Sequence, residues 1–177
     1  LDAFTHQVER YVLLWFTDYK VKLSTDSVRD REKLQALNSI VPNTRIRLDV
    51  NNLWQHVYEV TNHLHSLGLP IFAIEEPMRV GDYAGLAQVA DLLDAKIVLD
   101  ESFLREQQFA ALLNTPSNWI INLRISKMGG LLRSLVIAEK ARELNIPLII
   151  GAQVGETSLL TRAALTVANI YRKNLLA

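Results

Sequence analysis

The sequence predicts an α/β fold of the TIM-like (β/α) barrel class, incomplete in this chain. Short apolar runs alternate with segments of helical spacing, which is the order of βαβ units in a parallel sheet. The runs are continuously apolar, as in strands that are covered on both faces. One strand and one helix recur about every 25 residues, as in a barrel whose strand ends meet at one mouth. The chain has 177 residues, fewer than the roughly 250 of a complete barrel.

Six predicted strands are rich in Ile, Val and Leu. They are YKVKLS at 19–24, RIRLDV at 45–50, IFAIEE at 71–76, KIVLDE at 96–101, WIINLRIS at 119–126 and PLIIGAQ at 147–153. The segments between them place apolar residues on one helical face, as Leu34, Leu37 and Ile40 do in the first. Predicted helices span 28–40, 54–69, 82–94, 105–114, 131–145 and 157–170. No clear strand follows the last helix, so we expect the final strand of the barrel to be absent.

The first residues do not fit this alternation. VERYVLLW at 8–15 resembles a strand, yet it directly precedes FTDYKVKLS. Two parallel strands need a crossover of a dozen or more residues between them. We therefore expect residues to be missing from the chain near positions 15 and 16.

Composition excludes several classes of function. The net charge is zero, which gives no electrostatic basis for binding nucleic acid or an anionic membrane. Without cysteine there is no disulfide framework, thiolate metal site or cysteine nucleophile. No apolar run approaches the roughly 18–20 residues of a membrane span, and the first residues lack the pattern of a signal peptide. We expect a cytoplasmic protein with no nucleic-acid or membrane partner.

Three acids, Asp49, Glu75 and Asp100, each end a predicted strand, one repeat apart. Taken singly, an acid in this place is explained as a helix N-cap or a solvated loop residue. Three carboxylates that converge without a cation would repel and raise one another's pKa. Mg²⁺ prefers oxygen ligands and would remove that repulsion, so the sequence predicts a metal site here. Supporting contacts are expected from Asn51, Glu76 and Glu101.

Lys20 and Lys22 are two residues apart on a predicted strand, so both side chains point to one face. Two close ammonium groups lower each other's pKa, which suits a general base. The alternative is a solvated pair on an outward face. Lys22 stands one repeat before Asp49, which favours the inward arrangement.

In this order, KVK, LDVN, IEEP, LDES and a strand before GG resemble the enolase superfamily, in its mandelate racemase/muconate-lactonizing-enzyme group. The resemblance covers about residues 16–160. It implies one catalytic (β/α)7β barrel domain over residues 1–177, without the N-terminal lid domain of the family. It also implies a small-molecule carboxylate substrate, Mg²⁺ with Mn²⁺ as an alternative, and a homo-oligomer.

The resemblance implies a role for individual residues. Lys22 would remove a proton α to a carboxylate, and Lys20 would hold down the pKa of Lys22 and contact the substrate carboxylate. Glu156, in VGETS, matches an acid of the family after the seventh strand, although the glycine before it is placed differently. The implied Mg²⁺ ligands are Asp49, Glu75 and Asp100.

Arg124 stands where many members of the group have a second lysine, and Lys127 follows three residues later. Arginine stays protonated and is a poor base. We therefore expect a one-base lyase resembling o-succinylbenzoate synthases, or a muconate cycloisomerase, with Arg124 contacting a ring or a carboxylate. If Lys127 rather than Arg124 faces the metal, a dipeptide or N-acyl-amino-acid epimerase is the alternative. A barrel that binds without catalysing is the alternative of another class.

Other candidates have weaker support. His63 and His65 do not share a helix face, and no serine has an evident histidine partner. Gly129 and Gly130 precede a helix, where a tight turn is a more common use than anion binding. We expect packing or solvated roles for His6, His56, His63 and His65, and no nucleophilic role for Ser102 or Ser158.

Overall fold

The computed structural model describes residues 1–42 and 44–176, which belong to two compact units. Unit 1 spans Leu1–Ala95, and unit 2 begins at Lys96. Within each unit, strands alternate with helical segments and the paired strands run parallel. This arrangement confirms the predicted α/β class. Within the described residues, a helix of the length and hydropathy needed to span a bilayer is not found.

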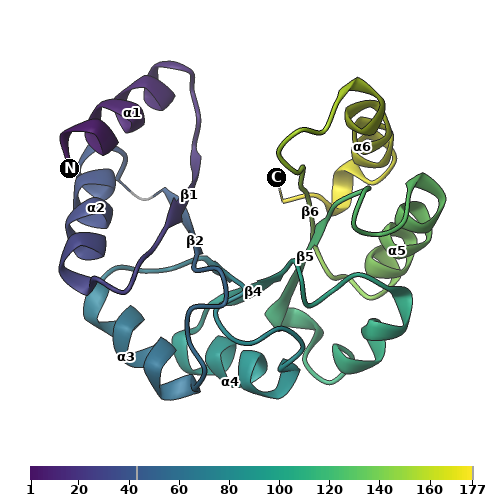
Figure 1. Cartoon of the computed structure of the whole chain (residues 1–177), viewed down its shortest axis with the longest axis horizontal. Helices are drawn as coiled ribbons and strands as arrows, with labels where there is room; N and C mark the ends of the chain where they lie inside the picture. The colour runs from purple at the N-terminus through teal and green to yellow at the C-terminus, as the bar shows by residue number, and fades with distance from the viewer. Residues whose placement is uncertain (43, 177) are drawn as a thin grey trace. The chain divides into compact units, whose positions relative to one another are not determined.

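Unit 1 is built from three parallel strands and four helices (Figure 1). The elements are α1 (Asp2–Leu13), β1 (Asp18–Lys22), α2 (Ser27–Ile40), β2 (Arg45–Asp49), α3 (Val57–Leu67), β3 (Ala73–Glu75) and α4 (Tyr83–Leu93). The register places Lys22 opposite Asp49 and Asp49 opposite Glu75. The three predicted strand ends of this unit therefore form one row across the sheet.

The core of unit 1 lies on one face of β1 and β2. Burial alternates along both strands, and Val21 and Leu48 point into the core. Leu34 and Leu37 of α2 are fully buried, as their helical spacing predicts. The opposite face of the two strands keeps the lysines and Asp49 accessible.

Helix α3 begins at a well-defined cap. The carboxylate of Glu59 accepts hydrogen bonds from the backbone N–H groups of Gln55 and His56, both at 2.9 Å. These two bonds, that of Gln55 first, lower the pKa of Glu59. At the other end, Gly68 takes the left-handed conformation that ends many helices.

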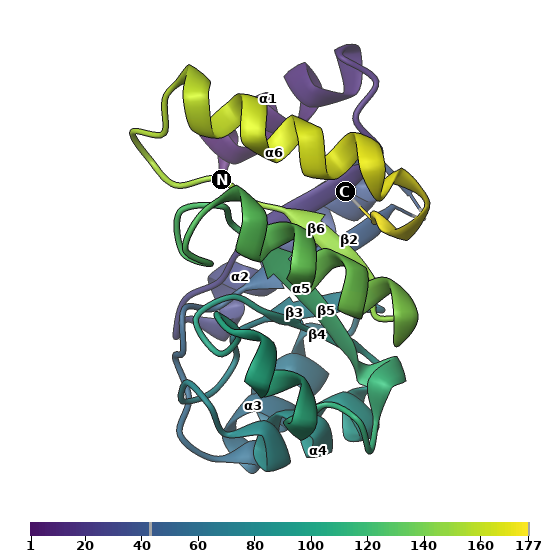
Figure 2. The ribbon, with the colours of Figure 1, turned by 90° about the vertical axis from the view of Figure 1, so that its right-hand side faces the viewer.

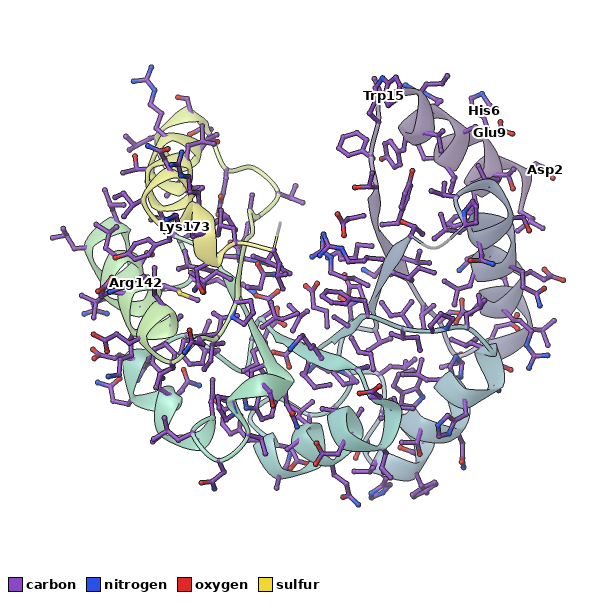
Figure 3. The ribbon with its side chains drawn as sticks, turned by 180° about the vertical axis from the view of Figure 1, so that it is seen from behind. Asp2, His6, Glu9, Trp15, Arg142 and Lys173 are labelled. Atoms are coloured by element: carbon purple, nitrogen blue, oxygen red, sulfur yellow. The ribbon has the colours of Figure 1, made fainter. Side chains whose placement is uncertain are left out.

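Residues 8–13 are helical, so the predicted strand at 8–15 is wrong. They form the second half of α1, of which Val8 is buried. Trp15, with φ of 64°, turns the chain into β1 and is 89% exposed (Figure 3). The apolar run at 11–16 is exposed rather than buried as a strand would be. Four residues join α1 to β1, so the expected missing segment near 15 and 16 is not needed.

Unit 2 also has three parallel strands, with α5 and α6 lying side by side (Figure 2). Its elements are β4 (Lys96–Leu99), η1 (Glu106–Ala111), η2 (Pro116–Asn118), β5 (Trp119–Leu123), α5 (Leu131–Glu143), β6 (Leu148–Ile150), α6 (Ser158–Ile170) and η3 (Arg172–Asn174). Leu175 forms a parallel bridge with Leu148, and the Leu176 N–H donates to the Leu148 carbonyl at 2.8 Å. This contact is a single isolated bridge to β6, and no strand follows α6 within the described residues.

The predicted helix at 105–114 is a short 3₁₀ segment instead, η1. The Gln108 side chain accepts hydrogen bonds from the N–H groups of Leu104 and Arg105, and donates to the Ser102 carbonyl. These bonds hold the chain in tight turns directly after β4. Phe103 and Phe109 then pack edge to face, with ring centroids 4.7 Å apart.

Candidate active site

Lys20 and Lys22 lie on the same face of β1, as their spacing predicts. Tyr19 and Val21, which alternate with them, are buried in the core of unit 1, whereas both lysines are exposed. The register brings Asp49 of β2 onto the face of the lysines. The predicted lysine pair and the first predicted acid are thus neighbours.

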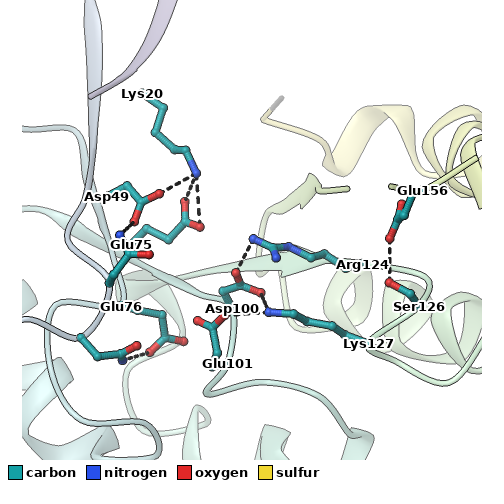
Figure 4. Close-up of polar contacts among 12 residues, drawn as sticks. Lys20, Asp49, Glu75, Glu76, Asp100, Glu101, Arg124, Ser126, Lys127 and Glu156 are labelled. Carbon is teal, nitrogen blue, oxygen red and sulfur yellow. Dashed lines mark hydrogen bonds and ion pairs between the residues drawn. The ribbon is translucent and has the colours of Figure 1, made fainter. Parts of the chain in front are cut away.

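Lys20 joins two of the predicted metal ligands (Figure 4). Its Nζ lies 2.9 Å from Oδ2 of Asp49 and 3.2 Å from Oε2 of Glu75. The Glu75 side chain is only 7% exposed, so its charge requires a compensating partner. Lys20 supplies that charge in this structure.

The two acids keep Lys20 protonated. Burial lowers the pKa of Lys20, but the bonds and charges of Asp49 and Glu75 outweigh burial, so the pKa is raised. Lys20 is therefore a fixed cation here. Its predicted influence on the pKa of Lys22 stays a prediction.

Lys22 has no side-chain hydrogen bond or ion pair within residues 1–42 and 44–176. It ends β1 and lies in one row with Asp49 and Glu75. The next N–H group, of Leu23, donates to the Asp49 carbonyl at 3.0 Å. Lys22 is therefore an exposed amine on the face of the sheet that carries Asp49.

The loops after β2 and β3 support these acids. Asn51 donates to Oδ1 of Asp49 at 2.9 Å, which is the supporting contact predicted for it. Glu76 is 2% exposed with φ of 43°, and it accepts from Nδ2 of Asn52 at 3.4 Å. The same Asn52 amide donates to the Met78 carbonyl at 2.6 Å. Sequence reasoning missed Asn52, although the doubled Asn after a strand indicates a left-handed turn.

In unit 2, Asp100 forms ion pairs with two basic side chains (Figure 4). It is 3% exposed and forms ion pairs with Arg124 Nη2 and with Lys127 Nζ, the latter at 3.0 Å. Lys127 also contacts Oε1 of Glu101 at 2.7 Å. Arg124 is thus in an ion pair with a neighbouring acid of the protein, and its expected contact with a substrate ring or carboxylate stays a prediction.

Opposing effects act on the acids of this cluster. Burial raises the pKa of Asp100, and the lowering by Lys127 and Arg124 does not cancel that effect. For Glu101 burial also raises the pKa, but the hydrogen bond from Lys127 outweighs it and the net shift is downward. Burial lowers the pKa of Lys127, whereas its bonds to Glu101 and Asp100 raise it, with a net upward shift. Lys127 is accordingly a cation shared by two acids.

Glu156 lies in the loop after β6, where the Ser126 hydroxyl donates to its Oε1 at 2.7 Å (Figure 4). The bond connects this loop to the turn after β5, which carries Lys127. The catalytic role implied for Glu156 stays a prediction.

The weaker candidates have structural contacts. His63 packs against Trp54, with ring centroids 5.0 Å apart, and His56 stacks on Tyr58. Ser102 is fully buried under η1. Gly129 and Gly130 take positive φ values of 83° and 102° in the turn before α5, which is the turn use predicted for the pair.

Two cavities in unit 2 lie elsewhere. One, of about 910 Å³, lies between η1 and α5, and its lining includes Leu104 and Leu132. The other, of about 690 Å³, lies beyond the C-terminal ends of α5 and α6, where Figure 3 labels Arg142 and Lys173. Neither is lined by a predicted site residue.

The donor chemistry of Asp49 and Glu75 fits a hard divalent cation. Both acids already direct an oxygen at one positive charge, that of Lys20. Carboxylate oxygens are the ligands that Mg²⁺ prefers. Among the described residues, no three His, Asp or Glu side chains gather as a metal-binding group. The set of three ligands that includes Asp100 stays a prediction.

Residues 3–176 match the model of a family described as enolase C-terminal domain-like. The L-Ala-D/L-Glu epimerase of Bacillus subtilis is 31% identical over 160 residues, covering 88% of this chain and 43% of that protein. The hydrophobic dipeptide epimerase of Enterococcus faecalis is 28% identical over 169 residues, covering 93% of this chain and 48% of that protein. The chain thus spans less than half the length of these relatives.

A crystal structure of dipeptide epimerase from Enterococcus faecalis V583 superimposes with a TM-score of 0.85 and 26% identity, over 96% of this chain and 49% of that one. A second structure of that protein, complexed with Mg and the dipeptide L-Leu-L-Tyr, gives a TM-score of 0.84 and 26% identity over 97% and 48%. These likenesses confirm the predicted fold class, an incomplete TIM-like barrel.

Proposed function

Since this chain belongs to the enolase C-terminal domain-like family, we propose that it is the catalytic part of an enzyme that removes a proton α to a carboxylate. One observation carries the proposal. Lys22 shares a row with Asp49 and Glu75, on a face where a second lysine already binds both acids. This arrangement supports the assignment of Lys22 as the base and of the two acids as ligands of a cation.

The chemistry requires both. A proton α to a carboxylate is very weakly acidic, and its removal leaves an enediolate with two negative charges. Lys22, when neutral, accepts the proton, and Lys20 offers a fixed positive charge beside the acids. When bound, Mg²⁺ supplies further positive charge to stabilise the carboxylate oxygens of the substrate.

The ligands proposed for Mg²⁺ are Asp49, Glu75 and Asp100. Asn51 orients Asp49 through its hydrogen bond at 2.9 Å. The third ligand rests on the motif order LDVN, IEEP, LDES in the sequence and on the family.

The relatives suggest the class of substrate. Those matched include epimerases named for L-Ala-D/L-Glu and for hydrophobic dipeptides, and a racemase named for N-succinyl-L-Arg/Lys from Bacillus cereus, 26% identical. We accordingly propose a dipeptide or an N-acylated amino acid, in which the acidic proton lies between a carboxylate and an amide nitrogen.

Arg124 favours a one-base reaction. A guanidinium stays protonated, and this one is paired with Asp100. For this candidate the substrate would be a carboxylate with a hydroxyl on the β-carbon rather than a simple dipeptide: Lys22 takes the α-proton and returns it to the departing hydroxyl, which leaves as water in a syn dehydration. A lyase or cycloisomerase of this kind is the first candidate.

Lys127 favours the second candidate, an epimerase. Its Nζ lies 3.0 Å from the same carboxylate that Arg124 binds, so a lysine is present at this end of unit 2 after all. The relatives named as epimerases support the same reaction. Lys22 and Lys127 would then act on opposite faces of the substrate α-carbon. One would remove the α-proton, and the other would deliver a proton that has exchanged with solvent.

Incubation of the full-length protein with Mg²⁺ and a dipeptide library in D₂O tests the proposal. We expect deuterium at the α-carbon by mass spectrometry, lost in Lys22→Ala and retained in the control Lys140→Ala on the surface of α5. Absence of exchange across the library would refute the enzyme and leave the non-catalytic binding module.

The stereochemistry of exchange separates the two candidates. Inversion that disappears in Lys127→Ala identifies the epimerase, whereas exchange with retention, or loss of water, identifies the one-base reaction. Calorimetric titration with Mg²⁺ should show one site that is lost in Glu75→Gln and kept in Glu143→Gln. Unaltered binding in Glu75→Gln would contradict the ligand assignment.

A further inference from the structure

Asp30, on α2, is a fully buried carboxylate that the proposed chemistry does not use. A buried charge is costly unless it is paired and hydrogen-bonded. Asp30 accepts hydrogen bonds from the Ser24 N–H at 2.8 Å and the Ser24 hydroxyl at 3.2 Å, and it pairs with Lys33 Nζ at 3.1 Å. Its hydrogen bonds from Ser24 therefore connect α2 to a single residue of the loop after β1.

That loop directly follows the proposed base. Ser24 is two residues beyond Lys22, and Leu23 between them donates its N–H to the Asp49 carbonyl at 3.0 Å. The backbone here is therefore held by β2 through Leu23 and by α2 through Ser24. Because the Lys22 side chain has no bond of its own within the described residues, its direction depends on this backbone.

The same carboxylate connects to the neighbouring loops. His63 Nε2, on α3, lies 3.7 Å from Oδ2 of Asp30, and its ring packs on Trp54 in the loop after β2. The Trp54 N–H donates to the Pro77 carbonyl, after β3, at 3.3 Å. Contacts therefore link Asp30 to the loops that follow all three strands of unit 1.

We propose that Asp30 is a positioning residue, which orients Lys22 by fixing Ser24. The inference rests on the proposed function, in which Lys22 is the base. A purely structural residue of α2 would stabilise the fold without altering the direction of Lys22.

Asp30→Asn and Leu37→Ala form a matched pair for the test. Asn keeps the volume of Asp30 but replaces one acceptor oxygen by a donor and removes the charge that pairs with Lys33. Leu37 is fully buried on the same helix and its side chain is apolar, so Leu37→Ala destabilises α2 through a cavity without removing a hydrogen bond to Ser24. Both variants are assayed at a temperature below their unfolding transitions. We expect kcat for α-proton exchange to fall about 10²-fold in Asp30→Asn, with KM nearly unchanged. In Leu37→Ala we expect kcat to stay near the wild-type value.

A second measurement does not need activity. In protein labelled with ¹³Cε-lysine, the Lys22 signal is identified by its loss in Lys22→Arg. We expect Asp30→Asn to shift or split this signal and to speed amide exchange at Leu23 and Ser24, and Leu37→Ala to do neither. Ser24→Ala, which removes only the hydroxyl, should give a smaller change in the same direction, and it replaces Asp30→Asn if that variant does not fold.

The outcomes are distinct. Equal losses of kcat in Asp30→Asn and Leu37→Ala, or an unchanged Lys22 signal with unchanged amide exchange at Ser24, would overturn the positioning role. If wild type shows no exchange that depends on Lys22, the proposed function fails, and the NMR measurements still decide whether Asp30 orients that lysine.

Discussion

The side chains of Asn122 and Arg124 lie directly against Gly151, which follows β6. A Cβ added to Gly151 would stand 2.2 Å from Oδ1 of Asn122 and 3.0 Å from Cγ of Arg124. Carbon contacts at their optimum are about 3.5–4.0 Å, so Gly151→Ala forces a displacement of about 1 Å. The φ of Gly151 is not in the left-handed region, so the effect is entirely one of space.

The cost follows from the surroundings. Asn122 is 5% exposed and the Arg124 side chain 17% exposed, so neither moves freely into solvent. Overpacking of this kind costs about 1–3 kcal/mol. For a chain of this size each kcal/mol lowers Tm by about 2–4 °C, which gives a fall of roughly 2–12 °C. The displaced Arg124 should also lose its contact with Asp100.

This cost is measured by urea and thermal unfolding of the full-length protein, monitored by Trp119 fluorescence. Trp119 is a suitable probe because it begins β5 and is 1% exposed. Wild type, Gly151→Ala, Asn122→Ala and the double variant form a cycle. We expect Gly151→Ala to cost less once the Asn122 oxygen is removed, with a coupling of about 0.5–3 kcal/mol. Strictly additive effects, or an unchanged Tm in Gly151→Ala, would refute the steric reasoning.

Three further outcomes are expected in unit 1. Lys20→Met should tighten Mg²⁺ binding about fivefold, as measured by calorimetry, because an ion pair worth about 1 kcal/mol no longer competes with the metal for the two acids. Weaker Mg²⁺ binding in this variant would contradict the competition. The pKa of Glu59 is lowered in the folded state, so its stabilisation is complete above its ordinary value of 4.5 and is lost as the pH falls through the folded pKa. The Tm of Glu59→Ala should therefore be below that of wild type at pH 7 and should converge on it toward pH 3, and a difference that does not depend on pH would argue against the carboxylate cap. Leu48→Ala, at a fully buried position of β2, should lower the free energy of unfolding by about 2–5 kcal/mol in urea titrations, and a loss below 1 kcal/mol would indicate that the site collapses.

The sequence was most informative where a repeat fixed the strand ends. The spacing of Lys22, Asp49 and Glu75 predicted that they share one level of the sheet, and the register confirms this. The two-residue spacing of Lys20 and Lys22 likewise predicted a common face. These predictions hold because side-chain direction in a strand depends only on local geometry.

Contacts that depend on tertiary structure were not predictable in this way. The run at 11–16 has the composition of a strand, yet those residues end α1 and turn into β1 in the open. Asp30 shares the buried face of α2 with Leu34 and Leu37, but only the folded loop brings Ser24 to it. Lys20, and not Lys22, is the lysine that binds both acids. Which of the two does so depends on how far each side chain reaches across the neighbouring strands.

Lys20 has a consequence for how the protein acquires its metal. Because the Lys20 ammonium already compensates one of the two negative charges of Asp49 and Glu75, unit 1 has an internal counter-ion for this pair, and we expect its fold not to require a bound ion. Mg²⁺ would then bind to the folded protein in competition with the Lys20 ammonium for oxygens of the same two acids. A chelator should accordingly stop turnover but leave the circular dichroism spectrum and the melting curve unchanged. Small zinc domains differ in this respect, because they unfold when their metal is removed.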